Sequence, residues 1–381
     1  MKVMFLIPHV SGGGGERVLA DLLHGLDDET VLVVFEKKFS YPLKGRLVSL
    51  DLPIDRGSML GRFTGFLRRV YRFRRLVAEE RPGVVISFMG EANLINALVS
   101  PKPVLTVHNH VSALTKMRGR LEAFAVGVLN KALYKRATVV AVSQSVAADL
   151  IENFGVPADR IVVIPNAVDE PEIAKMSAEP VIGPWRPDVP VVITTGRLAP
   201  EKGQSCLIRA FAEVRKTMPC QLAILGAGEL EDQLKRLASK LGVAKDVYFL
   251  GWQANPFKYL AKAAVFVSPS LTEGFGLALL EAMACGVPVI ATDCPGGQKE
   301  ILGSEFGILV PPASANELAS AIARVLGDAE LRSRLITAGL KRVKDFDRAR
   351  FLEGYRRLLA PFRGATHLQT NPTSGSKAAR G

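Results

Sequence analysis

Residues 268–291 read SPSLTEGFGLALLEAMACGVPVIA, and this stretch decides the fold. The apolar residues just before it form a short strand that ends at Ser268, where a glycine-rich turn begins. The residues up to Gly286 favour a helix, and VPVIA is typical of another buried strand. Strand, turn, helix and strand in this order predict a parallel β-α-β unit, with the turn at the carboxyl end of its first strand.

The same alternation of short apolar strands and amphipathic helices extends from this unit along the whole chain and occurs twice. In the first half the expected strands are 2–8, 31–35, 46–50, 83–88, 103–107, 138–142 and 161–164. In the second half they are 191–195, 220–225, 246–250, 264–268, 287–291 and 307–310. Such apolar strands are typical of parallel sheets covered on both faces. The sequence therefore predicts an α/β protein with two Rossmann-like, doubly wound domains facing each other across a cleft.

The proline distribution suggests where these domains divide. Six prolines lie between residues 165 and 190, which is typical of a linker. We expect a first domain over residues 1–167 and a second over 168–345. Residues 346–363 are expected to form a terminal helix that crosses back to the first domain. Residues 364–381 are rich in small and polar side chains, which predicts a disordered tail.

Composition excludes several other classes of protein. With 48% hydrophobic and 23% charged residues, the 381-residue chain is globular rather than fibrous or disordered. No stretch approaches the roughly 20 apolar residues that span a bilayer. The four cysteines form no C-x-x-C pair, which argues against a zinc or redox motif and favours a reducing cytoplasm. The net charge of +12 attracts polyanions such as anionic headgroups or phosphorylated ligands.

Two carboxylates flank the glycine turn, namely Glu273 and Glu281, with seven residues between them. Carboxylates accept hydrogen bonds from sugar hydroxyls, and the amides of such a turn suit a diphosphate. The arrangement resembles the Glu-x7-Glu motif of the retaining glycosyltransferases of family 4, which have the two-domain GT-B fold. The resemblance implies that Glu273 is catalytic and orients the donor sugar, and that Glu281 binds the ribose. The residues between them that it assigns to donor binding are Gly274, Phe275, Gly276 and Leu277.

Arg197 and Lys202 follow the first strand of the second domain and are five positions apart. Arginine offers a planar fork of donors and lysine a point charge, so the two can clamp one diphosphate. They match the Arg-x4-Lys element of the same family, which implies catalytic roles for both at the leaving group. Further matching segments imply donor binding by Gly226, Gly228 and Trp252.

A glycine loop, SGGGGER at residues 11–17, joins the first strand to the first helix. It does not fit a dinucleotide cofactor site, because no choice of first glycine completes G-x-G-x-x-G. Starting at Gly12, for example, the third position is Arg17. The family uses a similar loop near the transferred sugar, which implies that Gly13 and Gly14 contact the donor.

The strand ending in Thr-Val-His-Asn-His, residues 106–110, carries two candidate histidines on the cleft side. The family commonly has a histidine near the sugar hydroxyls at the matching place. On this ground we choose His108 over His110 as the catalytic histidine.

Residues 345–347, Asp-Phe-Asp, have the D-x-D spacing by which another class of glycosyltransferases binds a divalent metal. We instead expect Asp347 to cap the terminal helix, since aspartate is a favoured N-cap residue. No other D-x-D lies near the motifs above. The sequence therefore predicts no metal and no other cofactor, with the nucleotide-sugar as a substrate.

Residues 62–77 sort at about 100° per residue into an apolar side and a basic side. The apolar side holds Phe63, Phe66, Leu67, Val70, Tyr71, Phe73 and Val77, and the basic side Arg62, Arg68, Arg69, Arg72 and Arg75. One interpretation packs the apolar side on the sheet and leaves the arginines in solvent. A second adds contact between these arginines and anionic lipid. We expect no nucleic-acid partner, because no recognition module accompanies this helix.

Together these features imply a hexosyltransferase acting on a nucleotide diphosphate sugar. Residues 294–302, CPGGQKEIL, resemble the Gly-Pro-x-Glu-Ile stretch of enzymes that build polysaccharides and lipid-linked oligosaccharides, which favours UDP-sugars. The expected reaction moves a hexose or N-acetylhexosamine to a glycan or lipid-linked acceptor in bacterial surface polysaccharide or glycoconjugate synthesis. The expected location is the cytoplasm, with peripheral contact at the inner membrane. The alternatives are an epimerase or phosphorylase on the same fold, or a non-catalytic nucleotide-sugar-binding subunit.

Overall fold

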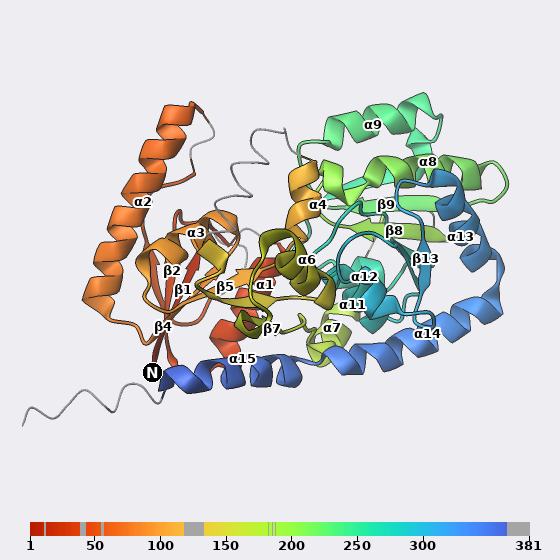
Figure 1. The fold of residues 1–381 in the computed structure, drawn as a ribbon. Coiled ribbons are helices and arrows are strands. Elements are labelled where there is room, and N and C mark those ends of the chain that lie inside the picture. The colour runs from red at the N-terminus through yellow and green to blue at the C-terminus, as the bar shows by residue number, and fades with distance from the viewer. Residues whose placement is uncertain are drawn as a thin grey trace, which may run out of the picture.

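A computed structural model describes residues 1–10, 13–38, 43–54, 57–117, 133–181, 183–184, 186 and 188–363. The described residues form two α/β units, each built on a parallel sheet (Figure 1). The two Rossmann-like domains expected from the sequence are thereby confirmed. The predicted tail and residues 11 and 12 of the glycine loop lie outside the described residues.

The first sheet has seven strands in the order β3-β2-β1-β4-β5-β6-β7. Their bounds are β1 (Lys2–Ile7), β2 (Glu29–Val34), β3 (Arg46–Ser49), β4 (Val84–Phe88), β5 (Pro103–Val107), β6 (Thr138–Ala141) and β7 (Ile161–Val163). The second has six in the order β10-β9-β8-β11-β12-β13. Their bounds are β8 (Val191–Thr195), β9 (Gln221–Leu225), β10 (Val247–Gly251), β11 (Val265–Ser268), β12 (Val289–Thr292) and β13 (Ile308–Val310).

Helices cover both sheets. Those in the first half of the chain are α1 (Gly14–Gly25), α2 (Met59–Glu80), α3 (Gly90–Val99), α4 (Val111–Lys116) and α6 (Gln144–Phe154). Those that follow are α7 (Glu170–Ser177), α8 (Gln204–Arg215), α9 (Glu231–Lys240), α10 (Phe257–Leu260), α11 (Leu277–Ala284), α12 (Gln298–Leu302), α13 (Ala315–Gly327), α14 (Ala329–Val343) and α15 (Arg348–Arg363). No helix among the described residues has both the length and the apolar character that crossing a membrane requires.

The strand β1 shows why these sequences form two-sided sheets. Val3 and Phe5 face a core shared with α1 and α15, whereas Met4 and Leu6, between and after them, face a core shared with α2 and α3. Successive side chains of a strand point to opposite faces, so an unbroken apolar run fits only a sheet covered on both sides.

The terminal helix α15 returns to the first domain and packs beneath its sheet (Figure 1). Leu352 and Tyr355 are buried in the same core as β1. The segment that leads into α15 lies beside the segment that leads from the first domain to the second, since Val168 pairs with Asp347 in a parallel bridge. The two domains are therefore joined by two neighbouring chain segments.

Residues 165–190 are not a plain linker, which corrects the sequence interpretation. They contain α7, whose N-cap Asp169 accepts a hydrogen bond from the Glu172 amide at 3.1 Å. Pro171 lies in the first turn, where the missing amide hydrogen costs nothing. Ile173 anchors the helix in the core at 3% exposure.

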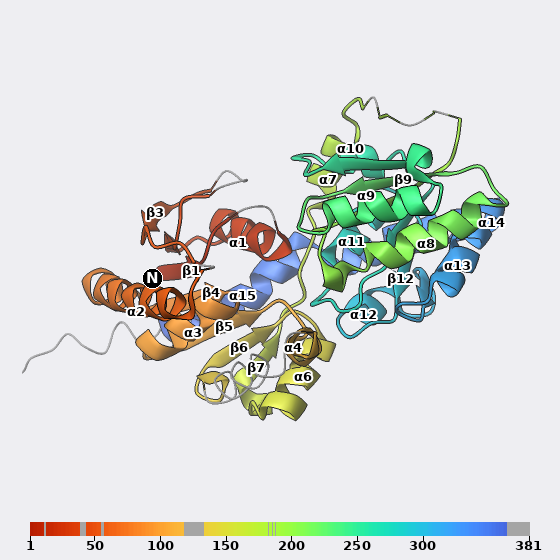
Figure 2. The same cartoon turned by 90° about the horizontal axis from the view of Figure 1, so that it is seen from above.

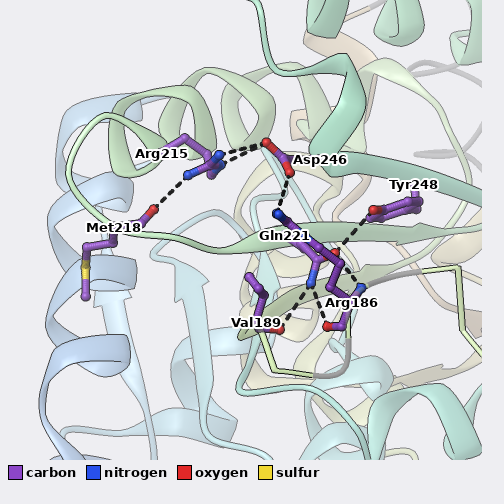
Figure 3. Close-up of polar contacts among 7 residues, drawn as sticks. All are labelled: Arg186, Val189, Arg215, Met218, Gln221, Asp246 and Tyr248. Carbon is purple, nitrogen blue, oxygen red and sulfur yellow. Dashed lines mark hydrogen bonds and ion pairs between the residues drawn. The ribbon is translucent and has the colours of Figure 1, made fainter.

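A polar network fixes where the chain enters the second sheet (Figure 3). The Gln221 amide in β9 donates to the carbonyl oxygens of Arg186 and Val189 at 3.0 and 3.2 Å, and accepts from the Arg186 amide at 2.8 Å. Asp246 accepts from Arg186 at 3.0 Å and from Arg215 at 2.9 Å. Because Gln221 is fully buried, these bonds satisfy polar atoms that water cannot reach. The network lies at the amino ends of the strands, so it supports the sheet rather than the cleft.

The basic helix predicted over residues 62–77 is the central part of α2, but Arg69 does not lie on its solvent side. The side chain is 1% exposed. Its guanidinium donates to the Pro53 carbonyl at 2.7 Å and forms an ion pair with Glu91 at 2.7 Å. A buried arginine is retained here because both its charge and its donors are paired.

The packed side of α2 is also narrower than predicted. Phe63, Leu67 and Tyr71 are 59%, 48% and 68% exposed, although the sequence pattern places them against the sheet. Phe73 is fully buried, and Phe66 packs against the same core. A helix on a sheet buries one stripe of its surface, and here Arg69 occupies part of that stripe. The rest of the apolar side is therefore left in solvent.

Candidate active site

The motifs of the second domain meet at the carboxyl ends of β8 and β11, which are neighbours in the sheet. This is the point where the strand order reverses, and ligands of doubly wound sheets bind at such points. Gly203 lets the two loops lie in contact, because a Cβ there would be 2.0 Å from the Pro269 carbonyl oxygen. Its φ of +65° also favours glycine.

Lys202 and Glu273 form the centre of this site. The Lys202 Nζ lies 2.6 Å from Glu273 Oε1, and the Ser270 hydroxyl donates to the same oxygen at 2.7 Å. The two side chains of the ion pair are 28% and 14% exposed. The sequence assigned them to a diphosphate and a sugar, and the structure brings them into direct contact. The pair therefore presents a positive donor and a carboxylate acceptor to one ligand.

Arg197 does not join this pair. Its guanidinium forms an ion pair with Glu201, four residues on, and its side chain is 63% exposed. Its backbone is held more firmly, since the Gln204 amide donates to the Arg197 carbonyl at 2.9 Å. The side chain can therefore reorient about a fixed backbone.

The other glycines of this half allow loops to stack closely. A Cβ on Gly226 would lie 1.9 Å from the Gly196 carbonyl oxygen, and one on Gly228 would lie 2.4 Å from that of Leu198. The loop after β9 therefore lies directly on the loop that carries Arg197. Trp252 follows β10 and is 47% exposed, so its ring has a free surface for stacking.

The glycine turn before α11 touches the first domain. A Cβ on Gly274 would lie 1.9 Å from the His108 carbonyl oxygen, and the Ser143 hydroxyl donates to the Gly274 carbonyl at 2.9 Å. Gly276, the N-cap of α11, has a φ of +101°. The side chains of Phe275 and Leu277 belong to the hydrophobic core. For these two predicted donor-binding residues, the backbone is the part that can reach a ligand.

Glu281 has a partner that the sequence analysis missed. Its carboxylate forms an ion pair with Arg17, which ends the SGGGGER motif and lies near the start of α1 in the first domain. The Arg17 guanidinium also lies over the Phe257 ring, 5.3 Å from its centroid. The sequence signal was present, because Arg17 stands in the SGGGGER motif. The carboxylate expected to bind ribose is thus engaged across the cleft.

His108 lies at the end of β5, beneath the glycine loop. A Cβ on Gly15 would lie 3.7 Å from the His108 ring. The ring stacks on Phe88 with centroids 5.5 Å apart, and Nε2 lies 3.0 Å from the Thr106 hydroxyl. Burial lowers the pKa of His108 to about 4, since the charged form is poorly solvated. The imidazole is therefore neutral near pH 7, and Nδ1 has no hydrogen-bond partner among the described residues.

The two remaining first-domain residues of the prediction lie at the start of α1. Gly13 is its N-cap and Gly14 its first residue. A Cβ on Gly14 would meet nothing within 4 Å, so this position borders open space. Glu16, in the first turn of the helix, is 4% exposed, and burial raises the pKa of its carboxyl group.

His110, the histidine set aside in favour of His108, has a different environment. Its Nδ1 lies 3.4 Å from the Asp149 carboxylate, which also accepts from the Ser112 amide at 3.0 Å. The pair joins the start of α4 to α6, and this structural role accounts for His110 without a part in catalysis.

Glu300 makes a further contact between the domains that the sequence analysis did not predict. The Glu300 carboxylate in α12 accepts from the Gln144 and Ser145 amides at 2.9 and 2.7 Å. These amides belong to the first turn of α6, where a negative charge is favourable. The Gly296 amide donates back to the Ser145 hydroxyl at 3.1 Å. Figure 2 shows α6 and α12 side by side at the boundary between the two units. The sequence contained Glu300 in a matched segment, but nothing in it identified α6 as its partner.

Within the described ranges, no group of three or more His, Cys, Asp or Glu side chains could hold a metal ion. Both aspartates of the D-x-D segment have other contacts. Asp345 pairs with Arg342 at 2.9 Å, and Asp347 accepts from the Arg350 amide at 2.8 Å at the start of α15.

Comparison with known proteins identifies the family. Residues 12–171 match the family described as Glycosyltransferase Family 4, and residues 177–342 match Glycosyl transferases group 1. An uncharacterised glycosyltransferase of Methanocaldococcus jannaschii is 31% identical over 337 residues, which cover 77% of this chain and 83% of the relative. The chain belongs to glycosyltransferase family 4. This family 4 glycosyltransferase therefore carries its matched motifs on both sides of one cleft.

Other relatives of the glycosyltransferase span nearly its whole length. A Campylobacter jejuni protein is 27% identical and covers 92% of the chain and 96% of its own. It is named as an N-acetylgalactosaminyltransferase acting on a diphospho-undecaprenol-linked sugar. Among solved structures, a sucrose-phosphate synthase from Thermosynechococcus elongatus superposes with a TM-score of 0.81, at 22% identity and 96% and 100% coverage. Anabaena HepE in complex with UDP gives 0.72, at 22% identity and 95% and 100% coverage.

Proposed function

We propose that this glycosyltransferase moves a hexose or N-acetylhexosamine from a UDP-sugar to a glycan or lipid-linked acceptor, with retention at the anomeric carbon. The observation that carries the proposal is the contact between Lys202 and Glu273 beside the glycine turn. It offers a cation for the diphosphate and a carboxylate for the sugar within one ligand's reach. The biological setting would be bacterial surface polysaccharide or glycoconjugate synthesis.

On the donor side, bond breaking leaves negative charge on the diphosphate. Lys202, a reoriented Arg197 and the backbone amides of residues 274–277 would stabilise this charge. Glu273 would accept hydrogen bonds from the sugar hydroxyls, and Glu281 from the ribose. The bond from the anomeric carbon to the phosphate oxygen breaks while the acceptor oxygen bonds on the same face. The acceptor proton passes to the departing diphosphate. No step requires a metal ion, because the cations of the protein supply the positive charge.

Two relatives support the choice of donor and acceptor. HepE, which shares the fold, has been solved in complex with UDP and with UDP-glucose. The Campylobacter jejuni relative is named for an undecaprenol-linked substrate. On the acceptor side, the neutral His108 offers a hydrogen-bonding nitrogen at the end of β5 without placing a cation beside the reacting sugar.

A transfer assay tests this function. The purified chain is incubated with UDP-glucose, UDP-N-acetylglucosamine, UDP-N-acetylgalactosamine or GDP-mannose, with and without polyprenyl diphosphate-linked sugars, and the products are identified by mass spectrometry. We expect a UDP-sugar to be consumed in step with a glycosylated product whose new linkage has the donor's anomeric configuration by NMR. Chelation with EDTA should leave the rate unchanged. Isomerisation of the donor without acceptor would instead support an epimerase.

A further inference from the structure

The outer face of α2 carries a row of exposed apolar side chains. Leu60, Phe63, Leu67 and Tyr71 are 72%, 59%, 48% and 68% exposed. At 100° per residue they fall within an arc of about 80°, so they form one stripe along the helix. With a rise of 1.5 Å per residue the stripe is about 16 Å long. Single exposed apolar residues are ordinary, but a continuous row of four large ones is typical of a surface that meets a partner.

Basic side chains border this stripe. The helix contains six arginines and two glutamates. Arg69 is buried against Glu91, whereas Arg68, Arg74 and Arg75 are exposed beside the apolar row. One of these, Arg75, pairs with Glu79 at 2.8 Å, which leaves an excess of positive charge on the outer face. An apolar row with arginines beside it matches the chemistry of an anionic bilayer surface.

The position of α2 leaves the stripe accessible. In Figures 1 and 2 the helix lies at the outer edge of the first unit, on the side away from the second unit. Its other side is held in place by Phe73, which is fully buried, and by the Arg69 ion pair. The exposed stripe is thus presented on a fixed helix, which lowers the entropic cost of docking.

We propose that the stripe Leu60, Phe63, Leu67 and Tyr71 inserts into the headgroup region of an anionic lipid bilayer while the neighbouring arginines contact lipid phosphates. A second copy of this chain fits less well, because a two-fold interface would set the arginine-rich face against itself. The inference deepens the proposed function and rests on it in one respect, since docking would favour a lipid-linked acceptor. Binding to the bilayer itself requires no donor and no turnover.

Vesicle flotation without any nucleotide-sugar tests the proposal. The full chain is mixed with vesicles of pure phosphatidylcholine or of phosphatidylcholine with phosphatidylglycerol. We expect flotation with the anionic vesicles, and a reduction of at least about tenfold in the partition coefficient for Phe63→Ser/Leu67→Ser/Tyr71→Ser. The matched control, Leu98→Ser/Ile151→Ser/Leu340→Ser, changes three exposed apolar residues elsewhere and should bind as the unchanged protein does. The charge variant Arg68→Gln/Arg74→Gln should bind the anionic vesicles more weakly, and its remaining binding should depend less on salt concentration.

Three results would overturn the proposal. The first is no flotation of the unchanged protein with anionic vesicles. The second is equal flotation of the stripe variant and the unchanged protein. The third is a vesicle-free dimer, seen by analytical ultracentrifugation, that the stripe variant dissociates. Thermal melting shows whether the variants fold, and turnover with a water-soluble acceptor should be the same in the stripe variant. Loss of that turnover in the unchanged protein would count against the proposed function alone.

Discussion

The two walls of the cleft pair their charged groups differently. On the second-domain wall, Lys202 and Ser270 both donate to the same oxygen of Glu273, at 2.6 and 2.7 Å. On the first-domain wall, His108 is neutral and Glu16 is buried 3.8 Å from the His9 ring nitrogen. A wall with a preformed ion pair suits a charged ligand whose geometry is fixed. A wall whose candidate catalytic residue is a neutral imidazole suits an acceptor recognised by shape and by a few hydrogen bonds.

The largest expected effect tests the charged wall. Lys202→Ala removes the cation beside Glu273, so kcat should fall by about 100- to 1,000-fold, the range for a transition-state donor. Steady-state kinetics with the donor that the transfer assay selects measure the loss. The matched control is Lys216→Ala, an exposed lysine paired with Glu213, which should leave kcat unchanged. Undiminished turnover of Lys202→Ala would remove the contrast between the walls.

Gly274→Ala tests how closely the two walls must meet. The added Cβ would lie 1.9 Å from the His108 carbonyl oxygen, so the domains must separate or the turn must shift. We expect a loss of about 1–3 kcal/mol in the free energy of unfolding, as for overpacking, with a lower kcat/KM. Urea unfolding and kinetics measure both. Gly90→Ala, where a Cβ meets nothing within 4 Å, should be neutral. Equal behaviour of the two variants would show that the close approach is unimportant.

Glu300→Gln tests the contact between the walls outside the ligand site. Removing its charge weakens the bonds to the first-turn amides of α6 by about 1–2 kcal/mol. The expected result is a higher KM for the donor with a smaller change in kcat, because the arrangement in which α12 contacts α6 is less populated. Glu305→Gln, an exposed carboxylate, is the control. A lower kcat at an unchanged KM would contradict a purely positional role.

His108 provides a prediction about pH on the first-domain wall. Its pKa is about 4 in the folded protein against an ordinary 6.5, so the unfolded chain binds the proton more readily. Its contribution to stability is therefore complete above about pH 6.5 and is lost as the pH falls toward 4, by at most about 1.4 kcal/mol per pH unit. Urea unfolding at pH 7 and pH 5 should show a smaller loss for His108→Asn than for the unchanged protein. His24→Gln, an exposed histidine, should show the unchanged loss.

The smallest expected effect concerns the ion pair that joins the walls. If Arg17 and Glu281 must separate before a ribose binds, Arg17→Ala should tighten UDP binding about two- to fivefold, the free energy of a partly exposed ion pair. Isothermal titration measures the affinity. Weaker binding in this variant would place Arg17 on the ligand instead. Arg209→Ala, in α8 of the second domain, is the control.

The match between sequence and structure was best where the signal is local. Each expected strand was found, because apolar runs and glycine turns act through neighbouring residues. The prediction of a plain linker from the proline-rich stretch was wrong, because Asp169 caps a helix there and Pro171 fits its first turn.

The sequence by itself determined the two α/β domains, the order of their strands along the chain and the residues that we propose for the donor site. It did so because periodicity and motif spacing are local properties of the chain. Only the tertiary structure decided which face of α2 is buried, that Arg17 reaches Glu281 and that Glu300 binds the start of α6. The pairs meet across the two domains, 264 positions apart for Arg17 and 155 for Ser145. The buried face of α2 depends on Arg69 finding Glu91 and the Pro53 carbonyl. Such partners are set by how separate elements pack, and no spacing within the chain specifies them.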